Sequence, residues 1–199
     1  AWRFDKDGIS RLKLPDNVLD ISLERLREIS GESLAVLRQA AVIGAHFDME
    51  ILAQLYPDEP SRVYHAIAEA SNARIIDYTE DRDHYAFIHS RVRNALQEQQ
   101  SERAMRESHQ KIAEALLGMD EGRPGRVYDL AEHFALGDAD DNPKRVYETN
   151  LEAGRLAVIH NASSTALSYF ETARGYLARS GYDIVSERAE LARWMGEAC

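Results

Sequence analysis

The chain has 199 residues, of which 44% are apolar, so its length allows one large domain or two small ones and its composition excludes global disorder. Lys and Arg total 24 against 34 for Asp and Glu, which gives a formal charge of −10. The charge is spread evenly along the chain, without a basic arm. Because binding to phosphate backbones requires clustered Lys and Arg, this balance argues against nucleic acid as the main partner.

Cysteine usage and hydropathy indicate the compartment. The single cysteine, Cys199, cannot build a disulfide or a thiolate zinc site within the chain. No stretch approaches the roughly 18 apolar residues of a membrane span, and the N-terminal AWRFDKDG lacks the apolar core of a signal peptide. We therefore expect a soluble, cytoplasmic protein without a membrane partner. Because the chain starts at Ala1 without Met and stops inside a helical pattern, we also expect it to be part of a longer protein.

The first hundred residues combine helical and extended patterns. Apolar residues at helical spacing predict helices over residues 15–28, 32–43, 49–56, 61–71 and 89–97. Pro15 and Asp16 are expected to start the first helix, Gly44 to end the second in a left-handed cap, and Asp48 to cap the third. Two β-prone runs, 74–79 and 85–88, flank the polar turn EDRD and predict one hairpin. Three helices, a hairpin and a further helix are the order of a winged-helix domain.

From Ser101 onward the pattern is helical throughout. Helices are predicted over residues 102–117, 126–136, 143–160, 162–179 and 185–199, with short connections typical of antiparallel helical hairpins. The small, small, aromatic and small packing positions of a tetratricopeptide repeat are matched by Gly154, Ala166, Phe170 and Ala173. Asn150, Ala157 and Ala178 depart from that repeat pattern, so one repeat is visible.

The predicted fold class is therefore mainly α. A winged-helix-like domain with one β-hairpin, residues 31–100, precedes antiparallel helical hairpins of tetratricopeptide-like type, residues 101–199.

Motifs for catalysis are absent from the sequence. It contains neither GxxxxGK[ST] nor GxGxxG, and no nucleophile elbow, HExxH motif or cysteine–histidine pairing. The seven histidines are dispersed, so we expect no metal site and no cofactor in this chain. The carboxylate pairs Asp140/Asp141 and Asp81/Asp83 lie in polar loops, where solvated turn residues are expected. We predict that the chain is not an enzyme.

A DNA-binding role for the winged helix would need a basic third helix and a basic wing. The third predicted helix offers Arg62 and His65 but also Glu69, and the EDRD turn holds three acids and one base. Repulsion from phosphate disfavours this role.

The segment HYAFIHSRVRNALQ carries the strongest candidate site. Alternation places Tyr85 and Phe87 on one face of a strand, and His89 follows at the junction with the next helix, close to Arg91 and Arg93. Two interpretations stay open at this point. The histidine is either satisfied by backbone groups at the helix start, or it faces a phosphate held by a neighbouring domain, with Arg91 and Arg93 as further nucleotide-sensing residues.

The order of several segments resembles a known family. These segments are WRFD, DNVLDISLERLREIS, LAVLRQAAVIGAHFDMEILAQL, FIHSRVRNAL, ERAMRESHQKIAEALL, YDLAEHFALGDA and AGRLAVIHNASSTALSYFETA. Together they resemble the region after the nucleotide-binding core of bacterial STAND-type (AAA-like) signal-transduction ATPases, which are multidomain proteins that include kinases, cyclases and transcription regulators. The resemblance covers essentially the whole chain, and it implies that residues 1–30 are the trailing helix or linker of an upstream ATPase module.

The resemblance also implies a function. In this family the winged helix is a regulatory lid whose junction histidine, within Met-His-Asp in many relatives, contacts the phosphates of bound ADP. Here the matching run is Ile88, His89, Ser90, so the acid is replaced by serine. The resemblance implies that the chain is a non-catalytic segment of a parent protein that binds ATP or ADP. It also implies two partners for this segment: the upstream nucleotide-binding domain of the same polypeptide, and a protein that binds the helical repeats. The alternatives are a DNA-binding transcription regulator and a stand-alone helical-repeat adaptor.

Overall fold

The computed structural model describes residues 18–79, 84–119, 125–182 and 184–198. The predicted helix start at Pro15 and Asp16, the polar turn 80–83 and Cys199 lie outside the described residues. The described chain forms two compact units. The first contains residues 18–49 and 58–99, and the second contains residues 50–57 and the described residues from 100 to 198.

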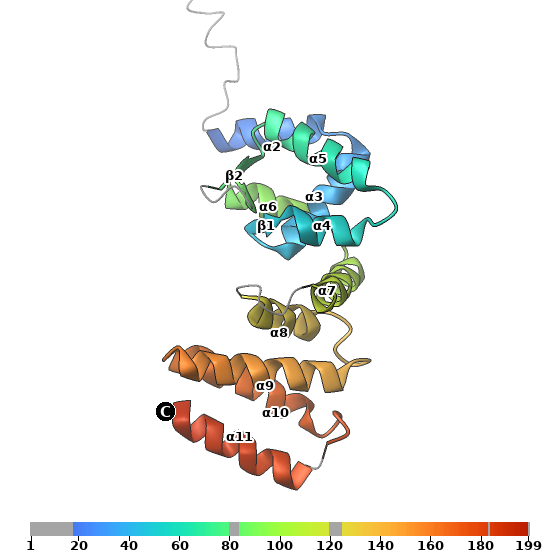
Figure 1. The fold of residues 1–199 in the computed structure, drawn as a ribbon. Helices are drawn as coiled ribbons and strands as arrows, with labels where there is room; N and C mark the ends of the chain where they lie inside the picture. Colours follow the sequence, from blue (N-terminus) through green and yellow to red (C-terminus); the bar gives the residue numbers. More distant parts are fainter. Residues whose placement is uncertain (1–17, 80–83, 120–124, 183, 199) are drawn as a thin grey trace, which may run out of the picture. The chain divides into compact units, whose positions relative to one another are not determined.

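The first unit contains four helices and three short strands among its described residues (Figure 1). The helices are α2 (Val18–Glu28), α3 (Gly31–Ile43), α5 (Pro60–Asn72) and α6 (Ser90–Glu98). The strands are β1 (His46–Asp48), β2 (Ile76–Tyr78) and β3 (His84–Phe87). Local chemistry sets the helix starts: the Ser30 side chain caps α3 by accepting from the Ser33 N–H, and Pro60 occupies the first turn of α5.

The strands form one antiparallel sheet in the order β1-β3-β2. The pairing of β2 with β3 confirms the predicted hairpin. The prediction of a single hairpin was incomplete, because β1 adds a third strand along the other edge of β3. Three residues are too few to show a period of two, so tertiary pairing rather than sequence pattern places β1 in the sheet. A row of aromatic rings crosses the sheet, with Phe47 5.9 Å and Tyr78 4.4 Å from the ring centre of Tyr85.

Helix α3 is central to the first unit and contacts both α5 and α6. It ends at Ile43, as predicted, but the backbone of Gly44 is extended (φ 166°) rather than left-handed. Glycine is favoured there for a different reason. A Cβ at position 44 would lie 2.8 Å from the carbonyl oxygen of His46, so a side chain would collide with the start of β1.

The second unit is helical throughout its described residues. It consists of α4 (Met49–Leu55, of which residues 50–55 belong to this unit), α7 (Glu102–Leu117), α8 (Arg126–Leu136), α9 (Pro143–Ile159), α10 (Ser163–Leu177) and α11 (Ile184–Ala198). From α7 onward each helix contacts the next one along the chain. The bounds agree with the predicted helices to within a few residues, since Ser101 caps α7 and Pro143 starts α9.

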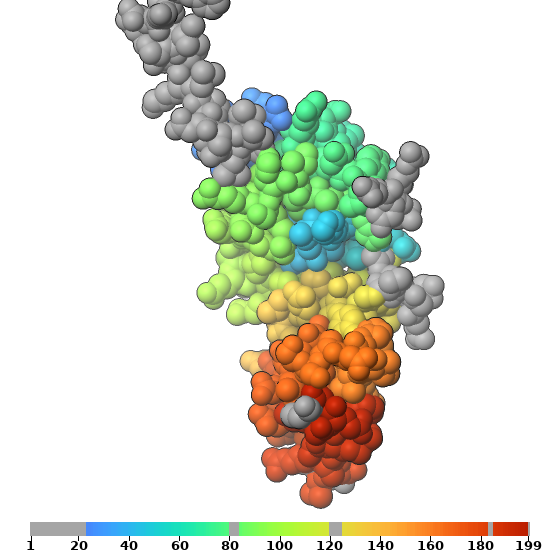
Figure 2. All heavy atoms as spheres, turned by 90° about the vertical axis from the view of Figure 1, so that its left-hand side faces the viewer, coloured from blue at the N-terminus to red at the C-terminus, as the bar shows by residue number. Residues whose placement is uncertain are grey.

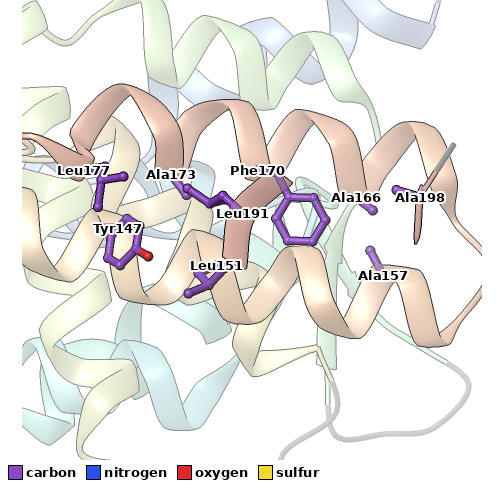
Figure 3. Close-up of a cluster of buried hydrophobic side chains, with 9 residues drawn as sticks. All are labelled: Tyr147, Leu151, Ala157, Ala166, Phe170, Ala173, Leu177, Leu191 and Ala198. Atoms are coloured by element: carbon purple, nitrogen blue, oxygen red, sulfur yellow. The ribbon is translucent and has the colours of Figure 1, made fainter. Parts of the chain in front are cut away.

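The core of α9, α10 and α11 is built around a close helix–helix contact. Gly154 of α9 lies directly under the ring of Phe170 from α10, because a Cβ at position 154 would be 2.3 Å from Phe170 Cε1. Ala166 and Ala173 are buried beside that ring, and Leu191 of α11 joins the same cluster (Figure 3). The four residues predicted to pack as in a repeat are therefore all buried at this contact.

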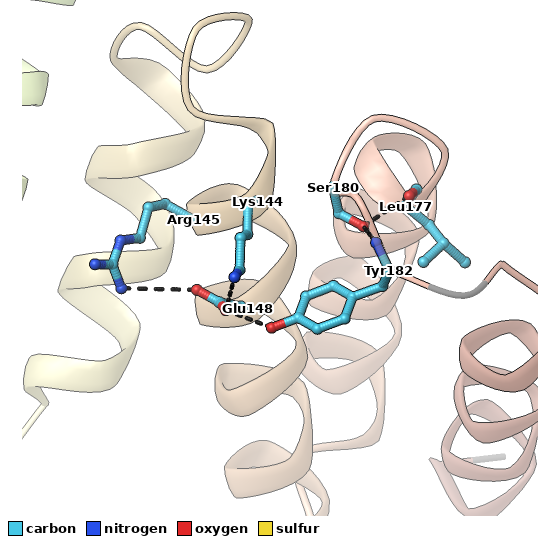
Figure 4. A network of polar contacts seen from close by, with 6 residues as sticks. All are labelled: Lys144, Arg145, Glu148, Leu177, Ser180 and Tyr182. Atoms are coloured by element: carbon cyan, nitrogen blue, oxygen red, sulfur yellow. Dashed lines mark hydrogen bonds and ion pairs between the residues drawn. The ribbon is translucent and has the colours of Figure 1, made fainter.

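Polar contacts join α11 and its preceding turn to α9. Tyr182 donates to Glu148 at 2.5 Å, and Lys144 and Arg145 lie 3.9 and 3.7 Å from the same carboxylate (Figure 4). Farther along, Tyr147 donates to Glu187 and Arg155 pairs with Glu190. In Figure 2 the atoms of α9 (orange) and α11 (dark red) lie directly against each other, in agreement with these contacts.

Hydropathy gives one further result. Within the described part of the chain, no helix combines the length and the apolar composition that a membrane span requires.

Candidate functional site

The predicted junction site lies where β3 passes into α6. His89 is the N-cap residue of α6, with an extended backbone (φ −131°, ψ 128°), and its carbonyl accepts from the Val92 N–H at 3.0 Å. Its imidazole is half-buried and makes no capping hydrogen bond. Capping of the first helical turn therefore uses the backbone of His89 and not its ring nitrogens.

The two arginines predicted beside His89 have different environments. Arg91 is exposed, whereas Arg93 is half-buried and its Nε donates to the Ala41 carbonyl at 3.0 Å, at the C-terminal end of α3. Gln97 donates to the same carbonyl at 2.8 Å. The structure thus places His89 and Arg91 at an accessible junction and directs Arg93 into the packing of α6 against α3.

The accessible face of α5 bears on the DNA-binding alternative. Arg62 pairs with Glu59 at 2.8 Å, and Glu69 accepts from the backbone N–H and hydroxyl of Ser30 at 2.9 and 2.8 Å. The exposed positions of α5 are uncharged or carry histidine: Pro60, Ser61, Tyr64, His65, Ala68 and Asn72. This face offers aromatic and hydroxyl groups rather than the cations that phosphate requires.

A buried histidine pair connects α7 and α8. His109 and His133 are 8% and 4% exposed, and their Nδ1 atoms are 2.7 Å apart. Since a hydrogen bond needs one donor and one acceptor, one ring carries its proton on Nδ1 and the other does not. Burial lowers the pKa of His109 to about 4 and that of His133 to about 3, and the neighbouring His109 adds to the shift at His133. The pair is therefore neutral near pH 7.

The second unit also has a surface groove, which we call the α8–α10 groove. Its volume is about 500 Å³, and it is lined by Ala131, Glu132, Ala135 and Leu136 of α8, Asn150 of α9, and Ser164, Thr165, Ser168, Tyr169 and Thr172 of α10. Neither this groove nor the histidine pair was predicted from the sequence. His109 and His133 are 24 positions apart, and the groove draws its residues from three separate helices. No local pattern in the sequence marks which faces of separate helices meet.

Among the described residues, no group of three or more His, Cys, Asp or Glu side chains could hold a metal ion. The histidine pair contributes two nitrogens that already bond to each other.

Comparison of the chain with protein-family models, with curated proteins and with solved structures found no match.

Proposed function

We propose that this chain is a non-catalytic regulatory and interaction segment of a larger STAND-type signal-transduction ATPase. The first unit acts as a winged-helix lid that responds to the nucleotide state of an upstream domain. The helices of the second unit act as a protein-binding scaffold. The sequence resemblance described above is the starting point of this proposal.

The order of elements supports the winged-helix assignment. Helix α3, strand β1, helix α5 and the β2–β3 hairpin follow one another in the first unit, and α4, most of which belongs to the second unit, lies between β1 and α5 along the chain. The sheet order β1-β3-β2 places the first strand beside the last, as expected for a winged helix closed by its hairpin.

The α9–α10 contact supports the tetratricopeptide-like assignment. A glycine on one helix and alanines flanking an aromatic ring on the next permit close approach, and here the ring of Phe170 covers Gly154. Stacked helical pairs of this kind present extended surfaces suited to protein binding.

The availability of the His89 imidazole is the observation that carries the lid proposal. The residue stands at the end of a strand and the start of a helix, so its backbone is fixed on both sides by β3 and α6. Its ring makes no capping bond and is half-exposed, so it can donate to a phosphate oxygen presented by another domain. A bound nucleotide would then favour the docked lid through a contact absent in the released lid.

The test uses the parent polypeptide with its nucleotide-binding domain. We expect His89→Ala to release a fluorescent ADP analogue about 10- to 100-fold faster, the effect of losing one charge-assisted hydrogen bond. His46→Ala, which changes an exposed histidine of β1, is the matched control and should leave the rate unchanged. If His89→Ala retains ADP as well as the unmodified protein does, the lid role is wrong.

A further inference from the structure

The α8–α10 groove has the dimensions of a ligand site. Its volume of about 500 Å³ lies inside the range of roughly 300–1,000 Å³ that is usual for such sites. All the residues that line it belong to the second unit. Leu136, which is 49% exposed, supplies an apolar wall at the α8 side of the groove.

Asn150 presents a hydrogen-bond acceptor at the groove. The residue is 2% exposed, and its Nδ2 donates to the carbonyls of Ala131 and Val146 at 3.2 and 2.9 Å. Its Oδ1 accepts no hydrogen bond from the residues that the structure describes. Asn150 is one of the residues that line the groove, and Oδ1 is the amide atom that these two hydrogen bonds leave available. Oδ1 is not among the fully enclosed side-chain atoms that lack a hydrogen-bond partner, so it is open to solvent and to a ligand that donates.

The charge of the groove selects for a cation. Glu132 is exposed at the α8 side, and none of the described lining residues is basic. Thr165, Ser168 and Thr172 add hydroxyl oxygens along α10. Burial, followed by the charge of Glu132, raises the pKa of Tyr169, so the phenol stays neutral and adds no competing negative charge.

We propose that the α8–α10 groove binds an arginine side chain of a protein partner, with Asn150 Oδ1 and the Glu132 carboxylate as its principal acceptors. Guanidinium carries five N–H donors and no acceptor, so it matches a groove whose acceptors lie on separate helices. Its planar fork offers separate N–H groups for the amide oxygen and for the carboxylate, which a single ammonium does less well. This inference rests on the scaffold role of the second unit, and it does not depend on the lid role of His89.

The experiment is a titration of the ¹⁵N-labelled chain with N-acetylarginine amide at millimolar concentration, followed by NMR. N-acetylcitrulline amide, which has nearly the same shape without the charge, is the matched ligand. We expect the side-chain amide signals of Asn150 to shift with the arginine compound and to stay in place with the citrulline compound. Glu132→Gln should abolish the shift, whereas Glu171→Gln, an exposed acid of α10 outside the groove lining, should retain it.

Three results would overturn the inference. They are the absence of a shift at Asn150, equal shifts with arginine and citrulline compounds, and equal losses in the two glutamate variants, which would indicate a diffuse effect of net charge. The ADP-release measurement on the parent protein is independent of this titration. If the titration fails and His89→Ala releases ADP faster, the arginine-binding proposal is wrong and the lid proposal stands. If the arginine compound binds and His89→Ala retains ADP, the lid proposal is wrong and the arginine-binding proposal stands.

Discussion

At the scale of single residues, Gly154 explains how α9 and α10 approach each other. Phe170 occupies the volume that a side chain at position 154 would need, with three ring carbons between 2.3 and 2.8 Å from the position of a Cβ. Ala157, Ala166 and Ala173 are also buried in this cluster, so small residues surround the aromatic ring. The packing positions were recognisable from the sequence because the offsets of a helical repeat are local along the chain.

Gly154→Ala should destabilise the second unit by roughly 1–3 kcal/mol, because overpacking outweighs the helix propensity gained from alanine. Gly175→Ala is the matched control in α10, where a Cβ meets nothing within 4 Å. It should stabilise the unit by roughly 0.5–1 kcal/mol. Urea unfolding can be followed by Trp194 fluorescence in a Trp2→Phe background, which leaves one tryptophan. Opposite signs for the two variants are expected, and a stabilised Gly154→Ala would contradict the close contact.

At the scale of elements, one carbonyl of α3 accepts two hydrogen bonds from α6. Ala41 lies in the last turn of α3, where carbonyls have no partner within the helix, and it accepts from Arg93 and Gln97 of α6. The sequence offered Arg93 as a phosphate ligand beside His89, because a linear sequence does not show which arginine points inward. In the structure this guanidinium supports the position of the helix that follows His89.

Arg93→Ala should therefore lower the free energy of unfolding of the first unit by about 1–2 kcal/mol, the contribution of a hydrogen bond from a charged group. Arg91→Ala, two residues away and exposed, should change it by less than about 0.5 kcal/mol. Thermal unfolding followed by circular dichroism of both variants provides the comparison. Equal effects would mean that the Arg93–Ala41 bond contributes nothing to the stability of the unit.

The helices were predictable from sequence at this scale, whereas the complete sheet was not. Apolar periodicity over ten or more residues, together with Ser101, Pro60 and Pro143 at helix starts, locates most helices. Strand β1 has only three residues, and it forms because the neighbouring β3 offers a free edge. The extended backbone of Gly44 likewise follows from the chain's turn into β1 rather than from a helix cap.

At the scale of the whole molecule, the net charge bears on which partners the protein can bind, and the buried histidines bear on how its stability changes with pH. The net charge of −10 and the exposed positions of α5, which carry no Lys or Arg, are unfavourable for contact with a phosphate backbone. The buried histidine pair makes the stability of the second unit depend on pH, because the two rings are neutral when folded and bind protons readily when unfolded.

The direction of that dependence follows from the pKa values. Burial lowers the pKa of His109 to about 4 and of His133 to about 3, from about 6.5 in the unfolded chain. The free energy of unfolding of the second unit is highest above pH 6.5. It falls as the pH decreases toward 4, because in that range the histidines take up protons in the unfolded chain and not in the folded one. Each histidine contributes a slope of up to about 1.4 kcal/mol per pH unit.

Urea unfolding between pH 7 and pH 5, with Trp194 fluorescence in the Trp2→Phe background, measures this slope. The double variant His109→Asn/His133→Asn should show a flatter dependence, and His46→Asn, an exposed histidine of the first unit, should keep the original one. A wild-type stability that does not change over this range would contradict the burial of a neutral pair.

The sequence by itself determined the mainly helical class, the bounds of most helices, the β2–β3 hairpin and the glycine–phenylalanine packing of α9 on α10. These features depend on residues close together along the chain, where spacing and capping chemistry specify local structure. Only the tertiary structure decided the third strand, the inward direction of Arg93, the His109–His133 bond and the α8–α10 groove. Each of these arises where separate elements meet, because the contact depends on which faces pack together and a linear pattern does not contain that information.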